Sequence, residues 1–169
     1  GTSEINDKLS RFEELTNASL AYMGVSSPGI PCELSSTVPN IKELDLSGNL
    51  LSEWKDVGII CEQLPALKAL NLSYNLMSPY KSELPLLKSI RVIVLNNTGV
   101  DWEQVELLKQ SLTTIEELHI MGNNISRIMQ FNKHPKLAIP SSTSELELLM
   151  LYLGHIRKWF PPSPHFHLE

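Results

Sequence analysis

The sequence predicts an α/β fold built from stacked copies of one short unit. The first observation is the pattern L-x-x-L-x-L-x-x-N-x-L, which residues 41–51 fill as IKELDLSGNLL. The second is recurrence, because five matches begin near residues 15, 41, 67, 90 and 115. The third is a helical period between some of the copies. These features are typical of leucine-rich repeats, so we predict a leucine-rich repeat solenoid with a parallel concave sheet and a helical convex side.

The second copy shows why the pattern has this spacing. Leu44 and Leu46 are two positions apart, so in a strand both side chains point into the same core. Asn49 follows where the chain leaves the strand, and its amide can bond backbone groups that the turn would bury. Asn75 and Asn123 take the same place in the third and fifth copies. We therefore expect Asn49, Asn75 and Asn123 to form a structural ladder along the solenoid.

The first copy is predicted to be degenerate. Residues 3–11 are polar with a weak helical character, and residues 15–25 match the pattern with Met23 in the place of the asparagine. Terminal copies are expected to be atypical because one of their faces has no neighbouring copy. Pro28 and Pro31 exclude a regular helix in the connection to the second copy. A loop is expected there.

Two later connections are predicted to be helical. Apolar residues recur at three- and four-residue intervals over 54–64, with Ser52 as the candidate N-cap. Residues 102–112 repeat this arrangement, with Asp101 as the cap. The tryptophan that begins each range is expected to pack in the core rather than to line a ligand site. Prolines in 78–85 predict a shorter, irregular connection after the third copy.

The pattern degrades towards the C-terminus. We therefore predict a leucine-rich repeat domain over residues 1–126 and a divergent segment over 127–169. A degenerate sixth copy is possible at 146–156, where Gly154 replaces the asparagine and the step lengthens to 31 residues. Three prolines in residues 157–169 predict a disordered tail.

The composition excludes several classes of protein. A chain of 169 residues with 42% hydrophobic and 20% charged residues is typical of one soluble domain. The net charge of −5 and the lack of a basic stripe argue against nucleic-acid binding. No apolar run reaches about 18 residues, which argues against a membrane span. Two cysteines, Cys32 and Cys61, are too few for the disulfide-rich caps of extracellular repeat domains, so a reducing compartment is expected.

The acidic side chains are unevenly distributed. Residues 1–62 hold ten acidic and four basic side chains, whereas residues 63–169 hold nine acidic and ten basic. An acidic N-terminal half fits a basic partner surface, and it equally fits a solvated face without a partner. The sequence leaves both interpretations open.

Motifs that carry catalysis or cofactor binding are missing. The sequence contains no phosphate-binding loop, dinucleotide fingerprint, zinc-protease motif or C-x-x-C pair. Cys61 falls on an apolar helical face, Cys32 in a loop and His119 in a predicted strand. His165 and His167 form only a weak metal-binding pattern in the predicted tail. We therefore predict no enzymatic activity, no cofactor and no metal site.

The predicted sheet does offer a binding surface. Strand residues between the fixed apolar positions point away from the core and form three rows across the copies. The candidate protein-binding residues are Glu43, Asp45, Ser47, Asn71, Ser73, Val92, Val94, Asn96, Glu117, His119 and Met121. Acidic residues lie towards the N-terminal end, and apolar residues towards the other. Exposed valines indicate either a partner or a covering segment of the same chain.

Four runs go beyond the generic repeat pattern. They are DKLSRFEELTNASLAYMGVSS (7–27), LDLSGNLLSEW (44–54), CEQLPALKALNLSYN (61–75) and the run from VLNNTGV to MGNNIS (94–126). These runs resemble the leucine-rich repeat region of the tubulin-folding cofactor E family, especially its plant members. The pairing of L-N-N-T-G with Trp102 makes the resemblance specific.

The resemblance implies a cytoplasmic, cytoskeleton-associated chaperone. It implies binding to α-tubulin and cooperation with other tubulin-folding cofactors when the tubulin heterodimer is assembled or dissociated. Family members also carry a glycine-rich domain and a ubiquitin-like domain, which this sequence does not contain. The leading hypothesis is a protein-binding module with no nucleic-acid or membrane partner. The alternative is a leucine-rich repeat regulatory or scaffold subunit that targets an enzyme such as a phosphatase, which would favour a uniform period of about 22 residues.

Overall fold

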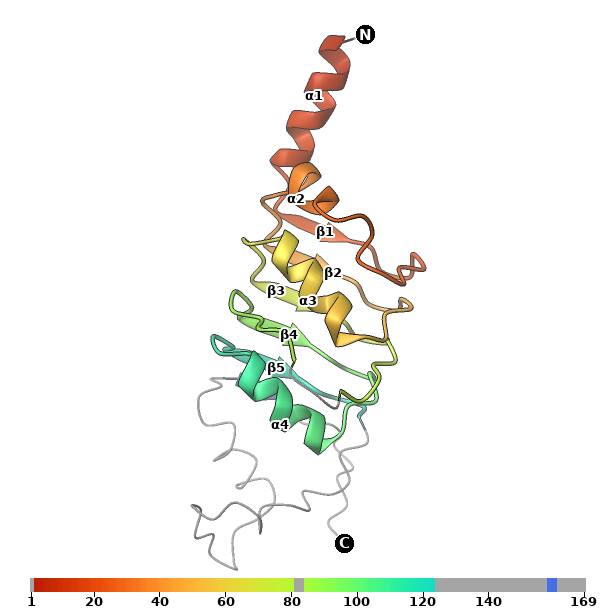
Figure 1. The fold of residues 1–169 in the computed structure, drawn as a ribbon, viewed down its shortest axis with the longest axis vertical. Coiled ribbons are helices and arrows are strands. Elements are labelled where there is room, and N and C mark those ends of the chain that lie inside the picture. Colours follow the sequence, from red (N-terminus) through yellow and green to blue (C-terminus); the bar gives the residue numbers. More distant parts are fainter. Residues whose placement is uncertain (1, 81–83, 124–157, 161–169) are drawn as a thin grey trace, which may run out of the picture.

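The computed structural model describes residues 2–80, 84–123 and 158–160 (Figure 1). The helices of this part are α1 (Thr2–Glu13), α2 (Glu33–Thr37), α3 (Trp54–Gln63) and α4 (Trp102–Ser111). The strands are β1 (Asn17–Ser19), β2 (Glu43–Asp45), β3 (Ala69–Asn71), β4 (Val92–Val94), β5 (Glu117–His119) and β6 (Lys158–Phe160). None of the helices described here has the combination of length and apolar character that crossing a bilayer requires.

The six strands form one parallel sheet in the order in which they occur in the sequence, from β1 to β6. Equivalent residues of successive copies pair directly, so that Leu44 lies opposite Leu70 and Leu70 lies opposite Ile93. The copies differ in length, but the differences lie in the connections between strands, so the register of the strand pairs is the same throughout. The predicted α/β architecture with a parallel sheet is confirmed.

One face of the sheet carries the core. Helices α3 and α4 lie along this face (Figure 1). The buried side chains at the fixed positions of copies two to five are Ile41, Leu44, Leu46, Leu51, Leu67, Leu70, Leu72, Met77, Ile90, Ile93, Leu95, Val100, Ile115, Leu118 and Ile120. Burying one such side chain fully contributes about 1.5–3 kcal/mol. The repeated pattern therefore marks the residues that hold the copies together.

The first copy is less well covered than the others. Leu15 and Leu20 occupy its fixed positions, and each remains 39% exposed. Helix α1 projects beyond β1 instead of covering this end of the sheet (Figure 1). The strand β1 nevertheless pairs with β2 along its whole length. Backbone pairing thus extends one copy further than the fully buried core.

Asparagines link the second, third and fifth copies to the copies that precede them. The Asn49 Nδ2 donates to the carbonyls of Leu46 at 2.8 Å and Leu20 at 2.9 Å. Its Oδ1 accepts from the backbone N–H groups of Met23 at 3.0 Å and Val25 at 2.9 Å. The same kinds of bonds are made by Asn75 and Asn123. One buried amide therefore satisfies backbone groups in two copies at once.

Thr98 takes the asparagine position in the fourth copy. Its Oγ1 donates to the carbonyl of Leu95 at 2.8 Å, which is a bond within its own copy. The side chain is too short to reach back to the third copy as Asn49 reaches back to the first. The ladder is interrupted at this position, and backbone bonds such as that from the Met77 N–H to the Thr98 carbonyl join these copies.

The predicted helical ranges match both α3 and α4, whereas the predicted cap matches only at α4. The Asp101 Oδ1 accepts a bond from the Gln104 N–H at 2.9 Å, which confirms Asp101 as the cap of α4. The prediction of Ser52 as the cap of α3 is wrong, because Glu53 is the N-cap and makes no side-chain capping bond. The Ser52 carbonyl instead accepts from the Ser78 N–H of the next copy. This bond holds residue 52 outside the helix.

Trp54 confirms the prediction of a core tryptophan, because its side chain is only 1% exposed. The corresponding prediction for the Trp102 side chain lies outside the described part. The loop predicted between the first two copies is partly wrong, since the five-residue helix α2 begins shortly after Pro31. Cys32 has a φ of 67°, so the chain turns sharply and then enters the helix.

Strand β6 was not predicted. It consists of Lys158–Phe160, within the range 157–169 for which the sequence predicts disorder, and it pairs with β5 in parallel. The physical reason is that β5 would otherwise end the sheet with unpaired backbone groups. The degenerate copy predicted at 146–156 lies outside the described residues.

Replacing Gly58 with alanine is expected to destabilise the protein, although alanine normally favours a helix by about 1 kcal/mol. A Cβ atom at this position in α3 would lie 2.5 Å from the Pro85 Cβ and 2.7 Å from its Cγ. Proline is rigid, so the helix must shift, and we expect the free energy of unfolding to fall by about 1–3 kcal/mol. Urea unfolding followed by circular dichroism measures this change.

The matched control is Glu62→Ala on the exposed side of the same helix. It should alter the unfolding free energy by no more than about 0.5 kcal/mol. A Gly58→Ala variant that is more stable than the wild type would show that α3 and the Pro85 segment do not pack this closely.

Candidate functional site

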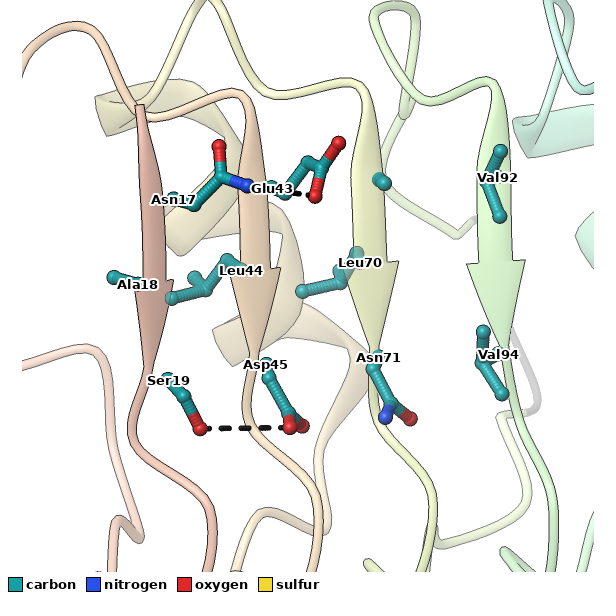
Figure 2. Close-up of a pocket in the computed structure, with 11 residues that line it drawn as sticks. Asn17, Ala18, Ser19, Glu43, Leu44, Asp45, Leu70, Asn71, Val92 and Val94 are labelled. Atoms are coloured by element: carbon teal, nitrogen blue, oxygen red, sulfur yellow. Dashed lines mark hydrogen bonds between the residues drawn. The ribbon is translucent and has the colours of Figure 1, made fainter. Parts of the chain in front are cut away.

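The face of the sheet opposite α3 and α4 contains a hollow of about 350 Å³ (Figure 2). Strands β1 to β4 line it, and this surface is called the hollow below. Its lining residues are Asn17, Ala18, Ser19, Glu43, Leu44, Asp45, Ala69, Leu70, Asn71, Val92 and Val94. Five of the predicted binding residues are brought together here, namely Glu43, Asp45, Asn71, Val92 and Val94.

The N-terminal side of the hollow is acidic. The Asn17 Nδ2 donates to the Glu43 Oε2 at 2.9 Å. On the next row, the Asp45 Oδ1 accepts from the Ser47 N–H at 2.9 Å, and the Ser19 Oγ lies 3.5 Å from Oδ2 (Figure 2). Neither carboxylate forms an ion pair with a described residue. Two oriented negative charges therefore lie on an open surface that a partner can reach.

The opposite side of the hollow is apolar. Val92 and Val94 lie on β4, and both are half-buried. Ala69 on β3 pairs with both Glu43 and Val92 and so separates them. Because neighbouring strands are about 4.8 Å apart, the surface changes from acidic to apolar over about 10 Å. A partner that fits both sides needs a basic group and an apolar group at that separation.

Four predicted residues lie beyond the hollow. His119 and Glu117 on β5 are joined by a contact of 2.6 Å between Nε2 and Oε1. Met121 is 42% exposed, and its N–H donates to the Asn96 Oδ1 at 2.9 Å. These residues extend the open face towards the C-terminal end of the sheet, but they do not line the same depression.

Ser47 and Ser73 are predicted to lie on the open surface, but both are buried. They are only 8% and 4% exposed, respectively. Each follows its strand into the turn, where its N–H donates to the side chain of Asp45 or Asn71. The chain has already begun to turn at this position, so the alternation expected of a strand no longer applies. These two positions of the predicted binding surface are therefore buried.

Asn17 and Ser19 were not among the predicted binding residues. Both belong to the degenerate first copy, which lacks the ladder asparagine. The alignment of residue 17 with 43 and of 19 with 45 was the available signal, and the register of β1 with β2 places these pairs side by side. Asn17 bonds the Glu43 carboxylate and Ser19 approaches the Asp45 carboxylate, so each limits the orientations of its neighbour.

The two cysteines differ in exposure, and neither is in a disulfide. Cys32 is exposed, whereas Cys61 is buried on α3. Burial, followed by the nearby negative charge of Glu62, raises the pKa of the Cys61 thiol to about 12. This thiol is therefore protonated and unreactive near neutral pH. Within the described ranges, no three His, Cys, Asp or Glu side chains are grouped as a metal site would require.

No protein-family model matches the chain. Tubulin-folding cofactor E of Arabidopsis thaliana is 54% identical over 159 residues, which cover 94% of this chain and 29% of the relative. Tubulin-specific chaperone E of Mus musculus is 38% identical over 130 residues, covering 75% of this chain and 25% of the relative. The Homo sapiens protein of the same name is 38% identical over 127 residues, covering 74% and 24%.

The chain spans less than a third of the length of each of these relatives. The plant match covers 94% of this chain, so it must continue well into residues 127–169. It therefore extends beyond the range of about 7–126 over which the sequence runs indicate the family. The similarity to tubulin-folding cofactor E that those runs predict is confirmed.

Proposed function

We propose that this chain is a leucine-rich repeat solenoid that serves as a protein-binding module of a tubulin-folding chaperone. Its partner is α-tubulin, which it contacts through the open face of the sheet during assembly or dissociation of the tubulin heterodimer. The observation that carries this proposal is the hollow, with its acidic and apolar sides, in a chain similar to tubulin-folding cofactor E. The module acts in the cytoplasm together with other tubulin-folding cofactors and does so without catalysis.

The repeat architecture is supported by three features that agree with one another. Strands of successive copies pair in one register, the fixed apolar positions are buried, and buried asparagines bond backbone groups of the preceding copy. A solenoid of this kind presents the open face of its sheet as one continuous surface. Binding then depends on the residues between the fixed positions.

The composition of the hollow suits a protein ligand. Its carboxylates have no cationic partner among the described residues, so the charge of Glu43 and Asp45 is available to a lysine or arginine. Val92 and Val94 supply apolar contact at the other side. Electrostatic complementarity sets the rate and register of association, whereas apolar contact contributes affinity. The enzyme-scaffold alternative is disfavoured by copies that repeat every 23 to 26 residues.

Tubulin binding by the 169-residue chain tests the proposal. Purified tubulin heterodimer is titrated against the wild type and against an Asp45→Lys/Val94→Glu variant, which reverses one charge and places another on the apolar side. We expect the double variant to bind at least about tenfold more weakly. Circular dichroism checks that both chains keep the same unfolding midpoint.

The matched control is Glu62→Lys, which reverses a charge on the exposed side of α3, outside the hollow. It should bind tubulin as the wild type does. Equal binding by the wild type and the Asp45→Lys/Val94→Glu variant would remove the open face from the binding site. No binding by the wild type would refute the proposed function.

A further inference from the structure

The turn after each of the first five strands has a left-handed backbone at one equivalent position, and Gly24 and Gly99 add a second left-handed residue to the first and fourth turns. In every copy the equivalent residue is the one just before the ladder position. Its φ is 58° at Tyr22, 64° at Gly48, 59° at Tyr74, 54° at Asn97 and 68° at Gly122. Five equivalent turns thus require the same conformation, and the residue at this position is glycine, asparagine or tyrosine.

Tyrosine is the unexpected choice at this position. Glycine adopts a positive φ without a steric penalty, and asparagine tolerates it, whereas a bulky side chain is strained there. The rings are largely exposed, since Tyr22 is 71% exposed and Tyr74 is 56% exposed. The Tyr22 ring contacts the fold at Gly48 of the next turn, where it fills the place that a Cβ atom would take. A strained backbone residue with an exposed aromatic side chain indicates a role outside the fold itself.

Further apolar side chains project from the same turns. Leu50 and Leu76 follow the ladder asparagines of consecutive copies and are 68% and 78% exposed, while Met23 is 71% exposed. Together with Tyr22 and Tyr74 they form a surface that we call the tyrosine ridge. Backbone bonds from Tyr22 to Ser47 and from Leu50 to Val25 stack these turns against one another. The ridge therefore spans the adjacent turns that follow β1, β2 and β3, and these strands also line the hollow.

The charged residues that flank the second turn have a net negative charge, with Lys55 as the one cation among Asp45, Glu53, Lys55 and Asp56. Asp45 precedes the second turn, and Glu53 follows it. No lysine or arginine occurs in the turn segments 20–26, 46–53 and 72–79. Lys42, Lys68 and Arg91 instead precede their strands, at the opposite edge of the sheet. A surface complementary to the ridge is apolar at its centre and carries lysine or arginine at its margin.

We propose that the tyrosine ridge is a second tubulin contact, continuous with the hollow, which docks an apolar patch with a basic margin on the tubulin heterodimer. This inference rests on the proposed function and adds a surface to it. Tyrosine suits such a role because it supplies a large contact area and a hydrogen-bonding hydroxyl at a small cost in side-chain entropy. Partner contact is then the reason that tyrosine replaces glycine in two of the turns.

The test compares a Tyr74→Gly/Leu76→Ala variant of the full chain with the wild type. Glycine relieves the strain at position 74, so the thermal unfolding midpoint should stay the same or rise. Affinity for purified tubulin heterodimer should fall about tenfold or more, because two exposed contact residues are lost. The control is Leu86→Ala, which removes a side chain that is 58% exposed but lies outside the ridge. It should leave binding unchanged.

The outcomes separate this inference from the proposed function. If the ridge variant binds like the wild type while the Asp45→Lys/Val94→Glu variant loses binding, the ridge is overturned and the proposed function stands. If Tyr74→Gly alone lowers the unfolding midpoint, tyrosine serves the fold and the ridge is likewise overturned. If the wild type does not bind tubulin, both proposals fail.

Discussion

Replacing Asn75 with alanine is expected to lower the free energy of unfolding by about 3–5 kcal/mol. The Asn75 side chain is completely buried between the second and third copies. Its Oδ1 accepts from the Leu51 N–H at 3.1 Å, and its Nδ2 donates to the carbonyls of Leu46 at 2.8 Å and Leu72 at 3.0 Å. Alanine leaves the Leu51 N–H buried without a partner and removes bonds that join two copies.

The matched control is Asn40→Ala. The Asn40 side chain is exposed and donates a single bond, to the Glu13 carbonyl at 2.8 Å. Water can replace this bond, so the expected loss is about 1 kcal/mol or less. Urea unfolding followed by circular dichroism measures both variants. Similar losses at positions 75 and 40 would show that the buried ladder contributes no more than a surface bond.

Replacing Trp54 with alanine is expected to cost about 3–5 kcal/mol of unfolding free energy, because a fully buried indole leaves a large cavity. Trp54→Phe should cost much less, about 1 kcal/mol or below. The Trp54 Nε1 is buried and has no hydrogen-bond partner among the described residues. Phenylalanine removes this unpaired donor while it keeps most of the apolar contact. Removing the unpaired donor therefore offsets part of the free energy that is lost with the smaller side chain.

Circular dichroism in a urea titration is the suitable measurement, because tryptophan fluorescence changes with the substitution itself. The comparison between the alanine and phenylalanine variants tests whether the indole N–H is unpaired. If phenylalanine destabilises the protein as much as alanine does, the indole N–H is bonded in solution and its pairing supports the start of α3.

The two proposed contacts divide the work of recognition in a physically consistent way. The hollow presents charge from Glu43 and Asp45, which steers a basic partner and fixes its orientation. The tyrosine ridge presents exposed apolar area, which contributes most of the affinity in protein interfaces. Salt should therefore weaken contacts made by the hollow more than those made by the ridge.

The sequence predicts much of this fold because its information is local and periodic. The spacing of Leu44 and Leu46 requires a strand with one buried face, and Asn49 needs buried backbone partners at the turn. Repetition of these constraints determines which residues pair, since any slip in register would expose the leucines. The capping of α4 by Asp101 is also local, and it follows the prediction.

The remaining features depend on contacts between copies, so the sequence pattern alone does not predict them. The Ser78 N–H donates to the Ser52 carbonyl, and Glu53 instead of Ser52 takes the N-cap position of α3. The turn buries Ser47, which the strand alternation places outside. Strand β6 joins the sheet from far along the chain because the free edge of β5 favours pairing there. The hollow itself arises when parallel pairing sets the acidic residues of β2 two strands from the valines of β4. The repeat pattern specifies the strands and their buried residues, whereas packing between copies sets which of the remaining side chains reach the surface.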